Sequence, residues 1–208
     1  MTEPKPDNRR PIPARDTALA HRVAAWLAAR GVSPNAISVA SVAFAAAGAA
    51  ALLLVARPWG PWLCAVAIVL RLLCNLFDGM VAIEGGRQTP TGALYNEVPD
   101  RLADSVFLVA LGHAAGVPWL GWFAALAAAL TAYVRTLGGA LGQPQDFRGP
   151  MAKPHRMWTM AAACVAAPLV DPWFAWPPTL AVAAALIAAG SVLGCIARLR
   201  AIAGRLAP

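Results

Sequence analysis

Residues 75–100 read NLFDGMVAIEGGRQTPTGALYNEVPD, and this stretch decides how the whole chain is interpreted. It lies between long apolar runs, yet it is rich in carboxylates and carboxamides, with one more carboxylate just beyond it: Asn75, Asp78, Asn96, Glu97, Asp100 and Asp104. Burying such groups is costly unless they are paired or bind a ligand. Ionisable residues inside apolar chains usually mark a functional site, so this stretch is the candidate site.

Composition identifies the class of protein around this stretch. Of the 208 residues, 59% are hydrophobic and only 13% are charged, whereas a soluble domain carries about a quarter charged residues. We therefore predict an integral membrane protein, and the length suits a single domain. The net charge of +7 comes mainly from predicted loops and tails, where cytoplasmic positive charge and anionic lipid head groups account for it. No nucleic-acid partner is predicted.

Six segments contain the roughly 20 apolar residues that a membrane-spanning helix needs. They are residues 35–56, 61–83, 97–116, 119–141, 155–175 and 178–201. Ahead of them, residues 16–31 have the helical periodicity of a helix lying on a membrane surface. The predicted fold class is thus all-α integral membrane, with six transmembrane helices preceded by an N-terminal amphipathic interfacial helix. Residues 1–15 are predicted to be a disordered cytoplasmic tail, and residues 32–208 the six-helix membrane domain.

The distribution of basic residues predicts the orientation in the membrane. They lie in the N-terminal tail, in residues 142–156 and at the C-terminus, whereas the opposite side carries almost only Arg57. By the positive-inside rule, both termini and the candidate site face the cytoplasm. The predicted location is the inner, or cytoplasmic, membrane of the cell.

Spacing places the polar residues of the candidate site on two helix faces. Residues 71, 75, 78 and 82 are three or four apart and share one face, and residues 96, 100 and 104 share another. A short cytoplasmic connection joins the two helices, so the faces can meet. Carboxylates grouped in this way repel one another unless a cation balances them. Oxygen ligands alone favour Mg²⁺, Mn²⁺ or Ca²⁺ over zinc.

A structural interpretation competes with the metal site. The same groups could cap helix ends and pair with Arg71, Arg87 and Arg101. We favour a metal or polar-substrate site, partly because Gly79 lies within a helix, where glycine costs about 1 kcal/mol relative to alanine. A glycine there allows a ligand to approach the backbone closely.

The stretch resembles the signature of the CDP-alcohol phosphatidyltransferases, D-x2-D-G-x2-A-R-x8-G-x3-D-x3-D. Five positions match at the right spacing: Asp78, Gly79, Ala82, Gly92 and Asp100. Three positions depart from it, because Asn75 and Asn96 replace two aspartates and Ile83 replaces the arginine. The resemblance covers nearly the whole chain, and the paired Asp-to-Asn changes are typical of a divergent subgroup rather than of random decay.

The resemblance implies a phospholipid-synthesis enzyme that transfers a phosphatidyl or phospho-alcohol group from a CDP-linked lipid donor to a small polar acceptor alcohol, with release of CMP. It implies one or two Mg²⁺ or Mn²⁺ ions, catalytic roles for Asp78 and Asp100, and Asp100 as the base. The predicted metal ligands are Asp78, Asp100, Asn75, Asn96, Glu97 and Asp104. Contacts with membrane lipids and a homodimer are further expectations.

The remaining predicted binding residues are glycines, one alanine and basic side chains: Gly79, Ala82, Gly92, Arg87, Arg135, Lys153 and Arg156. Arg87 would replace the missing arginine, and Arg135 would contact Asp104 or a lipid phosphate. Lys153 and Arg156 would recognise phosphate on the acceptor or on the lipid. An ordinary positive-inside loop explains these last two residues equally well.

Two other functions stay open. The two asparagines are compatible with a catalytically impaired relative that binds a CDP-lipid or a protein partner without turnover. A small transporter is disfavoured, because the chain lacks the internal repeat that many transporters have. The sequence does not name the acceptor alcohol or distinguish CDP-diacylglycerol from a CDP-alcohol as donor.

Overall fold

The computed structural model describes residues 13–86, 89–173 and 178–206. This part of the chain is helical, with two short 3₁₀ turns and no strand. The long helices are α1 (Ala18–Ala29), α2 (Pro34–Leu54), α3 (Trp59–Glu84), α4 (Gly92–Ala114), α5 (Pro118–Ala140), α6 (Lys153–Val170) and α7 (Thr179–Leu206). The 3₁₀ turns are η2 (Pro13–Asp16) and η3 (Asp171–Trp173).

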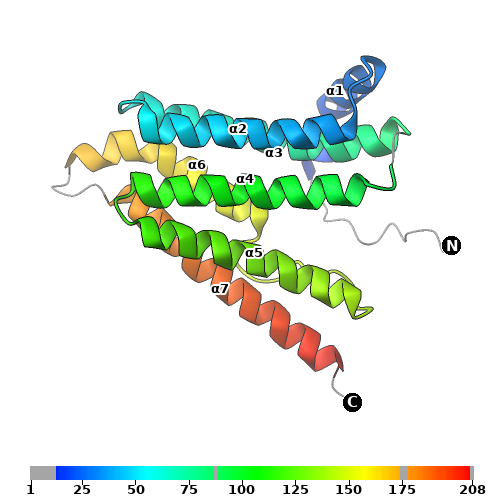
Figure 1. Ribbon diagram of the computed structural model, residues 1–208. Helices are drawn as coiled ribbons and strands as arrows, with labels where there is room; N and C mark the ends of the chain where they lie inside the picture. The colour runs from blue at the N-terminus through cyan, green and yellow to red at the C-terminus, as the bar shows by residue number, and fades with distance from the viewer. Residues whose placement is uncertain (1–12, 87–88, 174–177, 207–208) are drawn as a thin grey trace.

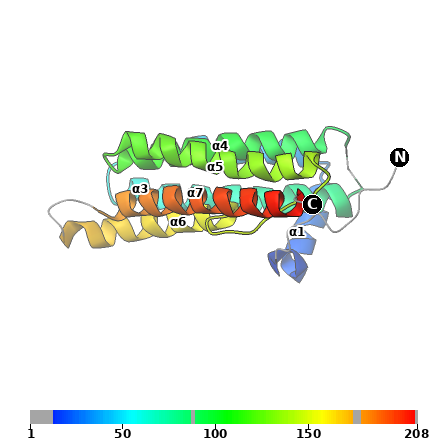
Figure 2. The ribbon, with the colours of Figure 1, turned by 90° about the horizontal axis from the view of Figure 1, so that it is seen from below.

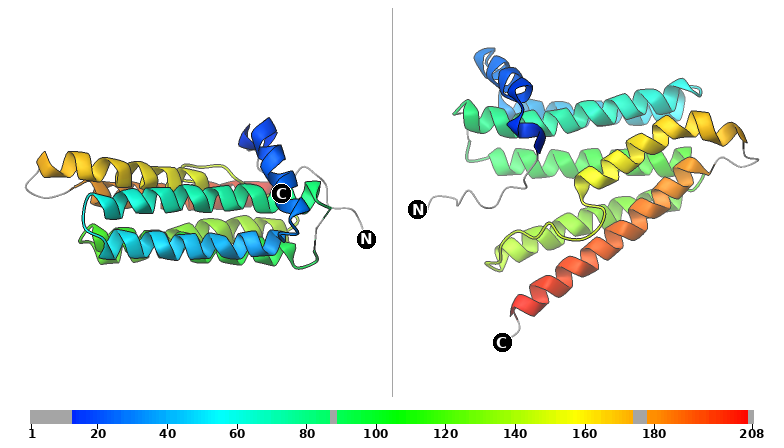
Figure 3. Two further views of the ribbon diagram at one scale, coloured as in Figure 1. Left: turned by 90° about the horizontal axis from the view of Figure 1, so that it is seen from above. Right: turned by 180° about the vertical axis from the view of Figure 1, so that it is seen from behind.

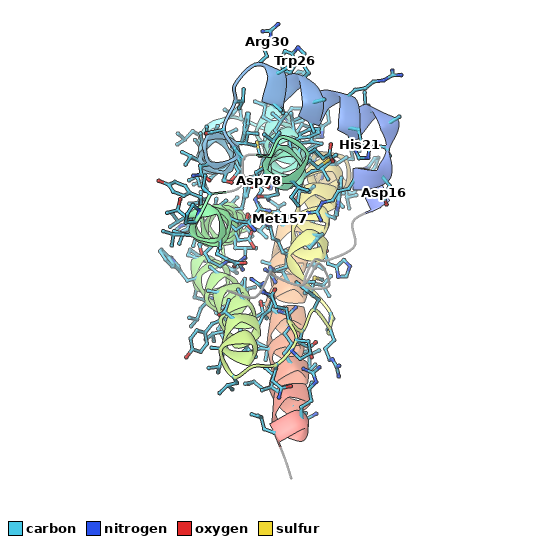
Figure 4. The ribbon with its side chains drawn as sticks, turned by 90° about the vertical axis from the view of Figure 1, so that its right-hand side faces the viewer. Asp16, His21, Trp26, Arg30, Asp78 and Met157 are labelled. Carbon is cyan, nitrogen blue, oxygen red and sulfur yellow. The ribbon has the colours of Figure 1, made fainter. Side chains whose placement is uncertain are left out.

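Six long helices form two rows of three. Viewed along the helices, α2, α4 and α5 make one row and α3, α6 and α7 make the other (Figure 4). The same two layers are visible from below (Figure 2). Consecutive helices run in opposite directions, so the α3–α4 connection, the α5–α6 loop and the end of α7 lie at one end of the bundle (Figure 1). That end carries the candidate site.

Four of the described helices are long and apolar enough to cross a membrane: α2, α3, α5 and α7. The predicted all-helical class is therefore confirmed, while the span count supported by hydropathy is four rather than six. The two remaining helices of the rows, α4 and α6, are less apolar because their ends at the site carry charged residues. These are Glu97, Asp100, Arg101 and Asp104 in α4, and Lys153 and Arg156 in α6.

The N-terminal helix α1 lies across the end of α3, at an angle to the bundle (Figure 3). Ala20 and Ala24 are buried against this end, whereas Leu19 and Trp26 are exposed. The turn η2, Pro13–Asp16, precedes α1, so the boundary predicted for the tail at residue 15 falls inside this turn. Most of that predicted tail, residues 1–12, lies outside the described residues.

Small residues allow the helices within a row to approach closely. At the crossing of α4 and α5, a Cβ atom added to Gly121 would lie 2.7 Å from the Leu108 carbonyl oxygen and 2.8 Å from the Gly112 Cα. Both neighbours are backbone atoms, which cannot move aside as a flexible side chain can. Close backbone contact through glycine is a common way to pack helices in membranes.

This crossing predicts a sharp difference between two glycines of α5. Gly121→Ala should destabilise the protein by about 1–3 kcal/mol, because the new methyl group has no space. Gly139→Ala is the matched control, since nothing lies within 4 Å of a Cβ atom added there. Thermal unfolding in detergent should show a melting temperature several degrees lower for the first variant and unchanged or slightly higher for the second. Equal melting temperatures would contradict the packing described for α4 and α5.

Candidate functional site

Arg71 is the centre of the polar cluster, and its side chain is fully buried. Its Nη2 atom donates to Asp104 Oδ1 at 2.6 Å and to Asp100 Oδ1 at 3.3 Å. A buried guanidinium requires such partners, because an uncompensated charge in a low-dielectric interior is strongly destabilising. The arginine thereby joins the polar face of α3 to that of α4.

Asn75 lies one helical turn after Arg71 and binds three neighbours. Its amide orientation is assigned from them: the nitrogen donates to Asp100 Oδ1 at 2.8 Å, and the oxygen accepts from Lys153 Nζ at 3.1 Å and Arg71 Nη1 at 3.0 Å. Lys153 Nζ also donates to Asp100 Oδ2. Asp100 is thus held by α3 on one side and by the first residue of α6 on the other.

Asp104 continues the network toward α5 and α6. Its Oδ2 atom accepts from Arg156 Nη2 at 3.1 Å, and both side chains are buried. Arg156 Nη1 donates to the Met151 carbonyl oxygen at 2.7 Å and lies 3.4 Å from Thr131 Oγ1. Both oxygens of Asp104 are therefore occupied by arginines of other helices.

The α5–α6 loop that leads to Lys153 is fastened to α7. Asp146 accepts from the Arg148 backbone N–H at 3.0 Å and from Arg205 Nη2 at 2.6 Å. Burial raises the pKa of Asp146. These hydrogen bonds and the nearby positive charges lower it by more than burial raises it, so the pKa lies below its ordinary value. Further along the loop, a Cβ atom added to Gly194 would lie 2.7 Å from the Pro150 carbonyl oxygen. The loop therefore packs directly on α7 and fixes where α6 begins.

A cavity of about 280 Å³ opens beside this network, between the start of α2, the end of α3 and the start of α4. It is lined by Pro34, Asn35, Ser38, Asp78, Gly79, Ala82, Thr89, Gly92, Ala93 and Asn96. Asp78 accepts from Ser38 Oγ at 2.7 Å and from the Gly79 N–H at 2.6 Å. Figure 4 shows Asp78 in the space between these three helices. The opening is large enough for a polar ligand.

The predicted site residues fall into two adjoining groups. Five line the cavity: Asp78, Gly79, Ala82, Gly92 and Asn96. Five belong to the buried ion-pair network: Asn75, Asp100, Asp104, Lys153 and Arg156. The two groups are electrostatically coupled, because Asp78 experiences the charges of Asp100 and Lys153.

Glu97 and Arg135 lie at the edge of the cluster, bound to each other. Arg135 Nη2 donates to Glu97 Oε1 at 2.5 Å, and its Nη1 donates to Gln145 Oε1 at 2.5 Å. Arg135 therefore binds Glu97 and Gln145 instead of Asp104, while its alternative contact with a lipid phosphate stays a prediction. Arg87 lies outside the described residues.

The competing structural interpretation accounts for part of the cluster. Arg71 pairs with Asp100 and Asp104, and Arg101 lies 3.5 Å from Glu97 and 3.9 Å from Asp100. Asp78 differs, because it accepts hydrogen bonds from a hydroxyl and a backbone amide, both neutral donors. Asp78 is the carboxylate of this cluster that lines the cavity.

The oxygen donors at this site are of the type that hard divalent cations prefer. Within the described ranges, no three His, Cys, Asp or Glu side chains are grouped closely enough to hold a metal by themselves. Asp78 and Asp100 supply carboxylate oxygens and Asn96 a carboxamide, the oxygen chemistry that Mg²⁺ and Mn²⁺ prefer. The Asn75 oxygen instead faces two cationic side chains.

Sequence reasoning missed five cavity residues: Pro34, Asn35, Ser38, Thr89 and Ala93. Asn35 and Ser38 are the two polar ones on α2. They are three residues apart on the first turns of α2, so they share one face of a helix that is otherwise apolar. That spacing was the available signal, although serine and asparagine near a helix start are also ordinary capping residues.

Comparisons with known proteins agree with this arrangement. The sequence profile of the CDP-alcohol phosphatidyltransferase family matches residues 31–196. The archaetidylinositol phosphate synthase of Aeropyrum pernix is 34% identical over 66% of this chain and 69% of its own length. The phosphatidylinositol phosphate synthase of Mycolicibacterium smegmatis is 28% identical over 83% of this chain and 78% of its own. The inner membrane protein YnbA of Escherichia coli is 27% identical over 73% of this chain and 76% of its own.

Solved structures share the fold. The phosphatidylinositol phosphate synthase of Mycobacterium tuberculosis with CDP-DAG bound superposes with a TM-score of 0.73 at 22% identity, covering 89% of this chain and 94% of that one. The same enzyme in complex with manganese and citrate gives a TM-score of 0.72 at 21% identity, covering 90% and 92%. The apolar helices and the inner membrane relative mark the chain as an integral membrane protein.

The match of the family profile covers most of the chain, including α2, α3, α4 and α6, which build the site. It reaches from the end of α1 to the middle of α7. The chain therefore belongs to the CDP-alcohol phosphatidyltransferase family, membrane transferases of phospholipid synthesis that move a phosphatidyl or phospho-alcohol group from a CDP-linked donor to an acceptor hydroxyl and release CMP.

Proposed function

We propose that this chain is an active transferase whose CDP-linked lipid donor binds in the cavity between α2, α3 and α4. One observation carries the proposal: Asp78, Gly79, Ala82, Gly92 and Asn96 line a single cavity next to Asp100. The small residues leave space for the pyrophosphate to approach the backbone of α3 and α4. The carboxylates lie beside that space.

Asp78, Asn96 and Asp100 are the residues that would hold a Mg²⁺ or Mn²⁺ ion. The chemistry such an ion supplies when bound is neutralisation of negative charge on the pyrophosphate and on the departing CMP. The chain's own contribution is to orient the ligands: Ser38 fixes Asp78, while Asn75 and Arg71 fix Asp100. The metal roles predicted for Glu97 and Asp104 stay predictions, since both already bind arginines.

Asp100 is the proposed base for the acceptor hydroxyl. Its carboxylate is held in place by Arg71 and Lys153. Each carboxylate oxygen has two lone pairs, so these hydrogen bonds leave acceptor capacity for the hydroxyl proton. The phosphoryl group would then pass to the acceptor oxygen as CMP leaves.

The acceptor is proposed to be a phosphorylated polyol of the inositol phosphate type, delivered from the cytoplasm. Two of the relatives are named for the synthesis of inositol phosphate lipids. The α5–α6 loop adds Arg148 and the first turn of α6 adds His155 at this end of the bundle, and both are exposed in a region suited to phosphate recognition. Lys153 and Arg156 each already bind a carboxylate. To make the predicted phosphate contacts, each side chain would have to bind the phosphate and its carboxylate at the same time.

The proposed membrane arrangement has six spans, with both termini and the site on the cytoplasmic side. It is supported by the antiparallel packing of α4 and α6 with the four apolar helices, and by the basic residues at the site end (Figure 1). At 23 residues, α4 is about 34 Å long, enough to cross a bilayer core. The surface location of α1 and the homodimer are parts of the same proposal.

Release of CMP tests the proposed reaction directly. The purified protein in nanodiscs should release CMP from CDP-diacylglycerol when inositol phosphate and Mg²⁺ or Mn²⁺ are present, and EDTA should stop the release. Asp100→Asn should lower the rate at least about a hundredfold, because the base and a charged ligand are lost together. Asp16→Asn changes an exposed aspartate that does not line the cavity; it is the matched control and should keep the normal rate.

No release with any acceptor alcohol would contradict an active transferase. If the protein still bound CDP-diacylglycerol in a metal-dependent way, it would be the catalytically impaired relative that binds the lipid without turnover. The asparagines at two signature positions are the feature of this chain that supports that alternative.

The cavity itself makes a second prediction. Ala82→Leu should raise the KM for the CDP-linked donor at least about tenfold, because the added carbons occupy donor space in a site whose walls are helix backbone. Ala47→Leu makes the same change on an exposed face of α2 and should leave KM unaltered. Equal KM values for both variants would show that the donor binds elsewhere.

A further inference from the structure

The ammonium group of Lys153 occupies a position between oxygen ligands on three sides of the site. It donates to Asp100 Oδ2 and to the Asn75 amide oxygen. Its positive charge also offsets the repulsion between Asp78 and Asp100. Its side chain is 22% exposed, so the charge is largely withdrawn from water. A cation held by two or more oxygens among carboxylates is the position that a metal ion would otherwise take.

Asn75 fits an ammonium neighbour better than a second metal ion. A carboxamide can donate to Asp100 Oδ1 while accepting from Lys153 and Arg71, which an ionised aspartate cannot do. An ionised aspartate at this position would place two like-charged oxygens about 2.8 Å apart. Such a pair would require a further positive charge between them. With asparagine at this position, no additional cation is needed between positions 75 and 100. The positive charge beside Asp100 is supplied by Lys153.

The backbone that carries Lys153 is held in place. Arg156 Nη1 binds the carbonyl of Met151, two residues before the lysine, and Met151 packs so closely on α7 that a Cβ atom added to Gly190 would lie 2.2 Å from its Cγ. Pro154 follows the lysine and restricts its backbone further. The lysine is thus aimed at Asp100 by the fold and is not a freely moving surface side chain.

Cations already surround the buried carboxylates of the cluster. Asp100 and Asp104 pair with Arg71, Lys153 and Arg156, and Arg101 lies 3.9 Å from Asp100. The pyrophosphate of a CDP-lipid adds about two negative charges, which one divalent ion neutralises. A second divalent ion beside Asp100 would add two more positive charges next to these cations.

From these observations we infer that Lys153 is a built-in cation that takes the place of one divalent ion, so that the site binds a single Mg²⁺ or Mn²⁺. The inference rests on the proposed function, because it concerns the same metal-dependent site. It also explains why asparagine, rather than an unrelated residue, stands at position 75.

Mn²⁺ titration of the full-length protein in nanodiscs, followed by electron paramagnetic resonance of the free ion, tests this inference without substrate. The unaltered protein should bind one ion at the site. Lys153→Met should bind that ion at least about tenfold more tightly, because a neighbouring positive charge is removed. The double variant Asn75→Asp with Lys153→Met should gain a second ion. Arg200→Met removes a positive charge from an exposed position near the end of α7 and should behave like the unaltered protein.

Two ions in the unaltered protein would overturn the inference, as would an unchanged affinity in Lys153→Met. If the double variant fails to fold, as judged by its thermal transition, the affinity change in the single variant decides the question. Absence of Mn²⁺ binding in every variant would remove the proposed metal-dependent function itself, and with it this inference. A third result would overturn only the inference that Lys153 takes the place of a metal ion. In that result the unaltered protein binds one ion, Lys153→Met binds it more tightly, and the folded double variant gains no second ion. The proposed function would then stay intact.

Discussion

The fully buried guanidinium of Arg71 is the contact on which the rest of the site depends. It joins α3 to Asp100 and Asp104 of α4, and Asp104 in turn binds Arg156 of α6. Removing one member of a buried ion pair typically costs about 3–5 kcal/mol, so this chain of charges fixes three helices at one end of the bundle. The helices need such a restraint, because packing among small apolar side chains alone gives little preference for one register.

Function follows from what this restraint leaves accessible. Asp104 is enclosed by arginines, whereas Asp78 faces a cavity with small residues around it. Asp100 lies between these environments, bound by Arg71 and Lys153 and coupled to Asp78. One carboxylate thus stabilises the fold, one faces the donor cavity, and one adjoins both. The same buried polar cluster therefore contributes both to the stability of the fold and to the chemistry of the site.

Spacing within single helices predicted a large part of the fold and of the site. The all-helical membrane class was predictable from composition, and the three- and four-residue intervals on α3 and α4 grouped residues that the structure brings together. Contacts distant in sequence were not predictable in this way. Lys153 lies 53 residues from Asp100, and Arg156 lies 52 residues from Asp104, so spacing does not say which helix they join. The beginning of α4 at Gly92 was also missed, because its first turn lacks the apolar pattern of a span.

Diffraction from crystals grown with Mn²⁺ and CDP-diacylglycerol, recorded at the manganese absorption edge, tests the central claim most directly. The account predicts one anomalous peak beside Asp78 and Asp100, the lipid pyrophosphate in the cavity between α2, α3 and α4, and Lys153 still bound to Asp100. Two anomalous peaks, with Lys153 displaced from Asp100, would contradict it. A lipid bound outside this cavity would contradict it as well.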